Sequence, residues 1–355
     1  MDTVRIGIIG IGGVAAAAHI PALLQNDHVK VTAVCDVDLK RAKTARRKYF
    51  KKAAVYEDYM ELLADENVDA VDILTPNFLH AEIAVEAFRA GKHVLCEKPD
   101  AISVEEAEKM YAASIEADRL LMVVRNHRFN LNAQYLKTFV EKERMGEIYV
   151  ARAVWKRRRG IPGKGGWFTT KELSGGGPLI DLGVHVIDLA WWLMGCPEVE
   201  AVTGNTYSMF ADNDAVDSPN AKFGDRVSDG TCDVEDLAIG TIRFRNGSVL
   251  QFETSWASNI YREERYVELY GSKAGAFWDG ARDEIYYESP GAKQKTHVVN
   301  QNEIASDHAR NIANFVDVLR GKADPVYTPQ QGIEMIKILS AIYTSAENGG
   351  KEIHF

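Results

Sequence analysis

Short apolar segments alternate with longer amphipathic segments over the first 125 residues of the chain. Apolar runs predict buried strands over 4–9, 29–35, 70–74, 93–96 and 120–124. Helical periodicity between these runs predicts helices over 39–50, 57–65, 78–90 and 103–117. Strands that alternate with helices in this way indicate a parallel sheet with helices on both faces.

The hydrophobic pattern changes after residue 125. Longer runs with alternating polarity predict strands over 147–155, 238–244, 249–256, 264–270 and 275–278. Asn246-Gly247 separates two of these runs and is a hairpin signal. We therefore expect an α/β protein with two domains: residues 1–125, and an α+β domain over 126–355 with an open, mostly antiparallel sheet. The acidic segment 211–236 is expected to be a solvated loop rather than a metal site.

Composition narrows the class of protein. A chain of 355 residues suits two domains, and its hydrophobic and charged fractions of 46% and 26% are ordinary for a globular protein. The net charge of −9 argues against a nucleic-acid partner, and the basic run 156–159 is too short to reverse this.

Cysteine usage and the absence of long apolar runs bear on the compartment. The 4 cysteines show no C-x-x-C spacing, which suits reduced thiols in the cytoplasm rather than a disulfide framework. We find no signal peptide and no apolar run approaching 18 residues, so we expect neither export nor a membrane span.

A glycine-rich turn follows the first predicted strand. Gly10-Ile11-Gly12-Gly13-Val14-Ala15 has the G-x-G-x-x-A pattern between a strand and a helix. Gly10 permits a tight turn, Gly12 lets the backbone approach a pyrophosphate, and Ala15 allows close packing of helix on strand. The free N–H groups at the helix start favour the anion. This turn predicts a dinucleotide-binding Rossmann domain.

An acidic residue follows the second predicted strand. Asp36 lies near the spacing expected for the carboxylate that binds the adenosine ribose. Its charge, with that of Asp38, would repel a 2′-phosphate, which favours NAD over NADP. Lys40 and Arg41 keep NADP possible, and Asp36 could also cap the next helix.

Two polar segments follow the third and fourth predicted strands, where ligands bind in open α/β sheets. Glu97-Lys98-Pro99 places an amine there, and lysine can transfer protons near neutral pH when it is desolvated. Thr75-Pro76-Asn77 with His80 either faces the nicotinamide side or begins the following helix.

The segment 175–188 combines a glycine run with three polar residues at helical spacing. Asp181, His185 and Asp188 stand at i, i+4 and i+7, which predicts one polar helix face. Asp181 could orient His185, whose imidazole suits it to accept a hydroxyl proton. A divalent metal site or a polar face buried against a loop remain alternatives.

Taken together, these motifs resemble the glucose-fructose oxidoreductase / inositol dehydrogenase (Gfo/Idh/MocA) family over essentially the whole chain. The resemblance rests on the glycine turn, on Thr75-Pro76-Asn77 with His80, on 90–99, on Arg128-Phe129, on the segment with Asp181 and His185, and on 233–238. It implies a Rossmann domain followed by an open-faced sheet domain. It also implies an NAD(P)-dependent oxidoreductase that transfers a hydride between nicotinamide and a sugar, sugar acid or cyclitol.

The resemblance also implies roles for individual residues. Lys98 would contact substrate and share proton handling, His185 would be the acid/base, and Asp181 would be its neighbour and substrate anchor. The predicted cofactor-binding residues are Gly10, Gly12, Gly13, Val14, Asp36, Thr75, Pro76, Asn77, His80, Glu97 and Lys98. The predicted substrate-binding residues are Lys98, Arg128, Trp155, Arg158, Trp167, Asp181 and His185. No metal is expected.

Two other functions occur in the same family. One is an NAD-assisted glycosidase, and the other is a non-catalytic regulator that binds the dinucleotide. A binding module has no need of a general base, so Lys98, Asp181 and His185 together favour an enzyme. We expect a homodimer or homotetramer, because a large open sheet face usually needs a cover.

Overall fold

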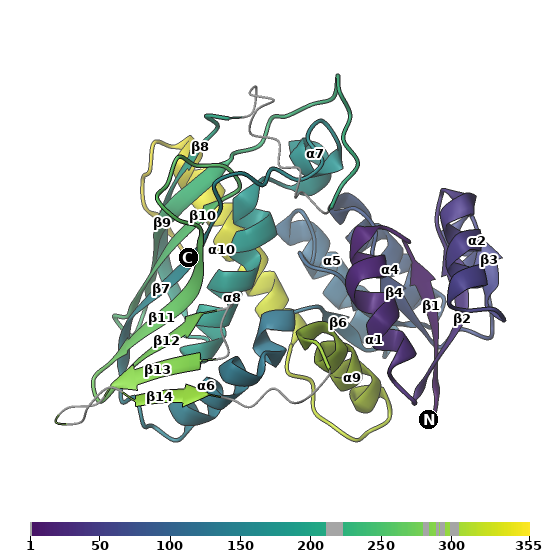
Figure 1. The fold of residues 1–355 in the computed structure, drawn as a ribbon, viewed down its shortest axis with the longest axis horizontal. Helices are drawn as coiled ribbons and strands as arrows, with labels where there is room; N and C mark the ends of the chain where they lie inside the picture. Colours follow the sequence, from purple (N-terminus) through teal and green to yellow (C-terminus); the bar gives the residue numbers. More distant parts are fainter. Residues whose placement is uncertain (1, 211–222, 280–283, 289–290, 292–294, 299–304) are drawn as a thin grey trace.

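The N-terminal part of the chain forms a six-stranded parallel sheet (Figure 1). The computed structural model describes all residues except 1, 211–222, 280–283, 289–290, 292–294 and 299–304. The strand order is β3-β2-β1-β4-β5-β6. The strands are β1 (Val4–Ile9), β2 (Val29–Cys35), β3 (Ala54–Tyr56), β4 (Ala70–Ile73), β5 (His93–Cys96) and β6 (Leu121–Val123). The order reverses between β1 and β4, where open α/β sheets bind ligands.

Helices connect these strands and cover the sheet. They are η1 (Ala15–His19), α1 (Ile20–Leu24), α2 (Leu39–Lys48), α3 (Tyr59–Leu63), η2 (Asn77–Leu79), α4 (His80–Arg89) and α5 (Val104–Glu116). Local sequence explains where they begin: Ser103 accepts a hydrogen bond from the Glu106 backbone N–H at the start of α5. At α2 the capping side chain is Asp38, so the alternative that Asp36 caps this helix is wrong.

The C-terminal part forms a nine-stranded sheet of order β14-β13-β12-β11-β7-β10-β9-β8-β15. Its strands are β7 (Ile148–Lys156), β8 (Val199–Tyr207), β9 (Leu237–Phe244), β10 (Val249–Ser255), β11 (Glu264–Gly271), β12 (Gly275–Asp279), β13 (Glu284–Glu288), β14 (Lys295–Val298) and β15 (Ile353–His354). Among the described strands of this sheet, only β7 and β10 pair in parallel, and the hairpin predicted at Asn246-Gly247 joins antiparallel β9 and β10. The predicted fold class is confirmed.

Helices of the C-terminal part contact both sheets (Figure 1). They are η3 (Asn126–Phe129), α6 (Leu131–Glu141), η4 (Trp167–Thr169), α7 (Lys171–Ser174), η5 (Leu179–Gly183), α8 (Val184–Leu193), α9 (Asp307–Leu319) and α10 (Pro329–Glu347). Helix α8 packs on β7 and β11, and α10 packs on β8, while α10 also contacts α5 and β6 and α9 contacts η1. The domain boundary after residue 125 stays a prediction.

Several elements were not anticipated from the hydrophobic pattern. These include β8, β13, β14, α6, α9, α10 and the two π-helices η1 and η5. Of the acidic segment 211–236 that was predicted to be a solvated loop, residues 211–222 lie outside the described residues, and 223–230 are exposed without regular structure. The prediction is wrong for the end of the segment, because Val234, Glu235 and Asp236 are buried. Among the described residues, no helix is both long and apolar enough to span a bilayer.

Candidate active site

The glycine turn between β1 and η1 has the geometry of a phosphate-binding loop. Gly10 has φ +95°, and a Cβ there would lie 2.7 Å from the Leu74 carbonyl oxygen, so only glycine fits. A Cβ at Gly12 would meet nothing within 4 Å. The backbone at Gly12 is therefore open to a ligand. Ala15 is fully buried at the start of η1, as the motif requires.

Asp36 follows β2 and is tied to this turn. Its Oδ2 accepts a hydrogen bond of 2.7 Å from the Ile11 backbone N–H, and its Oδ1 accepts one of 2.8 Å from the Asp38 N–H. These bonds fix the carboxylate beside the turn, where a ribose hydroxyl would have to lie.

The segment after β4 links the two parts of the chain. The Asn77 side-chain N–H₂ donates to the Ser174 carbonyl at 2.8 Å. His80 is buried, and its ring nitrogens lie 2.8 Å from the Pro99 carbonyl oxygen and 3.0 Å from that of Thr75. These contacts give Asn77 and His80 a role in holding loops together. Thr75 Oγ1 is buried without a hydrogen-bond partner among the described residues, so it is available to a ligand.

Lys98 and Asp181 form an ion pair between the two domains. Lys98 follows β5, and its Nζ donates to Asp181 Oδ1 at 2.7 Å and to the Asp181 carbonyl oxygen at 3.1 Å. The Trp256 indole N–H donates to the other carboxylate oxygen, Oδ2, at 2.9 Å. Burial would raise the pKa of Asp181, but the charge and hydrogen bond of Lys98, together with Arg157 and Trp256, outweigh it and the pKa is lowered. Asp181 therefore stays ionised and holds the amine in place.

His185 lies at the start of α8 among aromatic rings. Its ring centroid is 4.9 Å from that of His127 and 5.7 Å from that of Trp155. Burial, followed by the charges of Lys98 and His127, holds the pKa of His185 well below 6.5. The imidazole is therefore neutral at pH 7 and able to accept a proton.

Asp188 does not share the predicted polar face with Asp181 and His185. Asp181 lies in the π-helix η5, whose wider turns change the phase between its side chains and those of α8. The carboxylate of Asp181 binds Lys98 and Trp256, and no described contact joins it to His185. Asp188 is buried elsewhere and accepts hydrogen bonds from Arg125 and Arg128.

The remaining predicted substrate-binding residues have different surroundings. Arg128 is fully buried, binds Asp188 through two nitrogens at 2.8 and 2.7 Å, and contacts Gln331, which favours a structural role. Trp155 lies beside His185. Arg158 is exposed, and Trp167 stacks on Phe168 with ring centroids 3.8 Å apart.

A buried charge cluster under Lys98 was not predicted. His19, on the helix after the glycine turn, lies between Asp72 Oδ2 at 2.8 Å and Glu97 Oε1 at 2.9 Å. Burial would lower the pKa of His19, but the two carboxylates raise it to about 10. Burial would likewise raise the pKa of Glu97, whereas His19, His308 and Lys98 lower it to about 2. Glu97 therefore binds inward to protein rather than presenting a free carboxylate to a cofactor.

The residues that sequence reasoning missed share one property. Trp256, His19, His127 and His308 lie far in sequence from the motifs that they contact. Only His127 carried a signal, because it directly precedes Arg128-Phe129. The other three become relevant only when the chain is folded.

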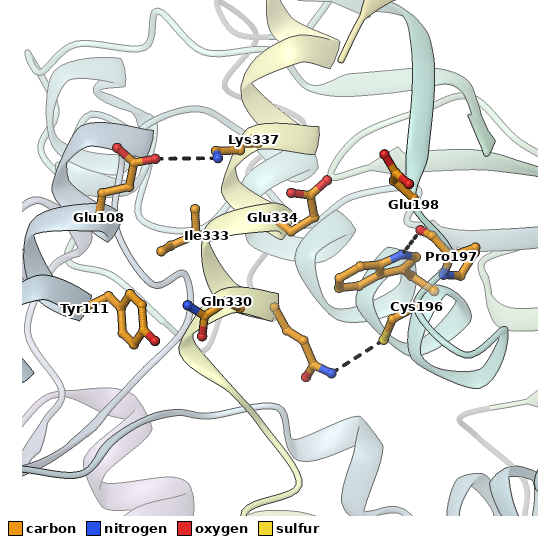
Figure 2. A pocket seen from close by; sticks show the side chains of 11 residues that line it. Glu108, Tyr111, Cys196, Pro197, Glu198, Gln330, Ile333, Glu334 and Lys337 are labelled. Carbon is orange, nitrogen blue, oxygen red and sulfur yellow. Dashed lines mark hydrogen bonds and ion pairs between the residues drawn. The ribbon is translucent and has the colours of Figure 1, made fainter. Parts of the chain in front are cut away.

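A cavity of about 630 Å³ lies apart from these residues (Figure 2). It is lined by α5, α10 and the connection from α8 to β8, including Glu108, Glu334 and Lys337. None of its lining residues belongs to the predicted site. The cavity therefore lies outside the candidate active site.

The residues around the glycine turn fit a dinucleotide. The open space at Gly12, the unpartnered Thr75 Oγ1 and the fixed Asp36 carboxylate lie along the carboxyl edge of the parallel sheet. These are the positions at which the pyrophosphate, nicotinamide and ribose of such a cofactor bind in a Rossmann fold.

Comparison with known proteins supports this geometry. Residues 4–125 match the model of an oxidoreductase family with an NAD-binding Rossmann fold, and residues 137–353 match the C-terminal alpha/beta domain of the same family. The chain therefore belongs to the Gfo/Idh/MocA family of oxidoreductases, and its N-terminal domain is an NAD-binding Rossmann domain.

Individual relatives agree over most of their length. The chain is 37% identical to D-glucoside 3-dehydrogenase of Escherichia coli, covering 97% of this chain and 96% of that protein. It is 31% identical to myo-inositol 2-dehydrogenase of Thermotoga maritima, covering 79% of this chain and 76% of that protein. The structure of the WlbA dehydrogenase from Bordetella pertussis in complex with NADH and UDP-GlcNAcA superposes with a TM-score of 0.80 at 25% identity, covering 99% of this chain and 98% of the other.

Proposed function

We propose that this protein is an NAD-dependent dehydrogenase that oxidises a secondary alcohol of a sugar, sugar acid or cyclitol, or reduces the matching ketone. The observation that carries the proposal is the pairing of Lys98 with Asp181 beside a neutral His185 at the carboxyl edge of the NAD-binding sheet. Relatives named as dehydrogenases of a glucoside and of myo-inositol support the substrate class.

His185 is the proposed proton acceptor. A secondary alcohol cannot release a hydride while it keeps its hydroxyl proton, and a neutral imidazole can take that proton. NAD, when bound, accepts the hydride at its nicotinamide C4. His127 and Trp155 flank His185 and restrict the water around it. In the reverse direction, the protonated imidazole returns the proton to the carbonyl oxygen.

Lys98 is the proposed electrostatic partner of the reacting oxygen. Its ammonium group can donate a hydrogen bond to this oxygen and stabilise the negative charge that develops as the proton leaves. Asp181 fixes the amine through two contacts, at its carboxylate and its carbonyl oxygen, and Trp256 fixes Asp181. Thus Trp256 and Asp181 together position the ammonium group of Lys98.

The test of the proposal is absorbance at 340 nm while inositols, aldoses, glucosides and sugar acids are offered with NAD, and then with NADP. We expect NAD to be reduced by one group of these compounds. His185→Asn should lower kcat about 10²–10⁴-fold and leave NADH affinity nearly unchanged. A near-normal rate in this variant would contradict the role of His185.

The same panel separates the alternatives. If no compound reduces NAD while NADH remains tightly bound, the proposal fails and an NAD-assisted glycosidase or a dinucleotide-binding regulator is favoured. Release of the aglycone from a glycoside without net NADH formation would then distinguish the first from the second.

We also propose a cytoplasmic homodimer or homotetramer. Cys35, Cys96 and Cys196 are free thiols, which suits a reducing compartment. The nine-stranded sheet exposes large apolar side chains, including Tyr149 and Ile239, that a second copy would cover. The mass of the protein in solution tests the assembly.

A further inference from the structure

The basic run 156–159 lies at the end of β7, and its members have different partners. Lys156 pairs with Glu264 at 3.0 Å and with Glu253 at 3.8 Å. Arg159 donates to the Asn259 side chain at 2.9 Å and to backbone carbonyls. Arg158 is exposed. Arg157 differs from all of these because its guanidinium lies over the ring of Trp155, which borders His185.

Arg157 is placed by Trp155. Its guanidinium carbon lies 5.0 Å from the centroid of the Trp155 ring, and this ring in turn lies 5.7 Å from that of His185. The Arg157 charge also contributes to the lowered pKa of Asp181, after the larger contribution of Lys98. The Arg157 guanidinium and the His185 ring therefore both lie beside the Trp155 ring, and the Arg157 charge acts on Asp181.

Arg157 has no counter-ion in the described part of the chain. No ion pair or side-chain hydrogen bond joins its guanidinium to another described residue, and the guanidinium lies over the Trp155 ring. The nearby carboxylate of Asp181 is already bound by Lys98 and Trp256. A partly buried cation without a partner is costly, so a ligand that brought a negative charge would be stabilised there.

A second guanidinium lies on the same indole ring. Arg265, on β11, has its guanidinium carbon 4.9 Å from the centroid of the Trp155 ring. The charges of Asp279 and Asp307 act on Arg265, so it adds no unbalanced charge to the site. The charge that favours an anion over a neutral group is therefore that of Arg157.

We propose that Arg157 determines substrate specificity by binding an anionic group of the sugar, a carboxylate or a phosphate. Arginine suits this task because its planar fork can donate two parallel hydrogen bonds to two oxygens of such a group. The proposal rests on the dehydrogenase function proposed above and narrows its substrate class to acidic sugars. Arg157 acts in binding, whereas His185 and Lys98 handle the reacting oxygen.

Binding measurements test the proposal without requiring turnover. Titration calorimetry of the full-length protein saturated with NADH would compare D-glucose, D-glucuronate and D-glucose 6-phosphate. We expect at least one anion to bind about 10-fold or more tightly than glucose. Arg157→Gln should lower the affinity for that anion about 10- to 100-fold and change the affinity for glucose less than about 3-fold. Arg157→Lys should retain part of the preference, because the charge remains but the fork is lost.

Controls separate charge recognition from damage to the fold. Arg144→Gln removes another arginine that lies over an aromatic ring, Phe139 at 5.6 Å, and should leave all three affinities unchanged. The thermal unfolding midpoints of all variants should match that of the unmodified protein. Raising the salt concentration should weaken binding of the anion but not of glucose.

Comparing the affinities for the two anions identifies which acidic group the site binds. Tighter binding of glucuronate indicates a carboxylate site, and tighter binding of glucose 6-phosphate indicates a phosphate site. If neither binds more tightly than glucose, or if Arg157→Gln weakens glucose and the anion equally, the proposal is overturned. Anion binding through Arg157 without NAD reduction by any sugar would contradict the dehydrogenase function alone. NAD reduction without an anion preference would contradict the role of Arg157 alone.

Discussion

At the scale of single residues, the protonation state of His185 decides how the site responds to pH. Burial lowers its pKa first, and the positive charge of Lys98 and the neighbouring His127 lower it further. Oxidation of an alcohol needs the neutral imidazole, so activity in this direction is lost only when the pH falls below the lowered pKa. The same shift means that His185 reduces the stability of the fold as the pH falls below about 6.5, where the unfolded chain takes up a proton.

The first prediction concerns the acid side of the pH–rate profile. We expect kcat/KM for sugar oxidation to stay constant as the pH is lowered from 7.5 to 6.5, and to fall only at more acidic pH. The measurement is initial NADH formation over this range, with unfolding monitored at each pH. A decline centred at or above pH 6.5 would show that His185 is not held neutral by its surroundings, or that another group accepts the proton.

At the scale of elements, the π-helix η5 explains why the spacing of Asp181 and Asp188 was predicted wrongly although a strand and a hairpin were predicted correctly. Local patterns define β5 at 93–96 and the hairpin at 246–247, because these depend on neighbours in sequence. The face of Asp181, His185 and Asp188 was predicted from α-helical spacing, and η5 breaks that spacing. Glu235 contributes to the local geometry of η5, because its carboxylate accepts hydrogen bonds from the Gly177 and Leu179 N–H groups at the start of this helix. The residue pattern of 175–188 could not predict this contact, because Glu235 lies outside that segment.

The turn between β1 and η1 allows a sharp test of cofactor binding. A methyl group at Gly12 would meet no protein atom within 4 Å, but it would stand where the backbone is open to the pyrophosphate. We therefore expect Gly12→Ala to leave the unfolding temperature without cofactor unchanged and to weaken NADH binding about 10-fold or more. Fluorescence titration of NADH and thermal unfolding measure the two effects.

Gly10→Ala is the matched control for this turn. Its φ of +95° and the Leu74 carbonyl oxygen 2.7 Å from a new Cβ mean that this variant should lose stability as well as NADH affinity. If Gly12→Ala binds NADH normally, the pyrophosphate does not approach the turn at this position.

At the scale of the whole molecule, a buried ion network joins the two domains. Asp100 and Arg125 come from the N-terminal part, and Asp188 on α8 comes from the C-terminal part. Asp188 also binds Arg128, while the Tyr327 hydroxyl donates to Asp100. Sequence patterns predicted both sheets but not this network, because its members are separated by up to 227 residues. Arg128 was predicted to bind substrate for the same reason. Its position in the sequence does not indicate that Asp188 is the residue it binds in the folded chain.

The last prediction concerns this network. Asp188→Asn removes the carboxylate that two buried arginines share and leaves Asp100 as the only described carboxylate paired with either of them. Removing one partner of a buried ion pair typically costs about 3–5 kcal/mol, so we expect a loss of stability of this order. Urea unfolding followed by circular dichroism measures it. Glu105→Gln breaks the exposed pair of Glu105 and Lys109 and should leave the midpoint unchanged.

Because the network joins the domains, its loss should also affect catalysis through the distance between them. Lys98 belongs to the N-terminal sheet and Asp181 to the C-terminal part, so their contact of 2.7 Å depends on how the domains are held. We expect Asp188→Asn to lower kcat while the NADH affinity of the Rossmann domain changes little. A variant with normal stability and normal kcat would show that packing of α10 on α5 and β6 holds the domains together without this network.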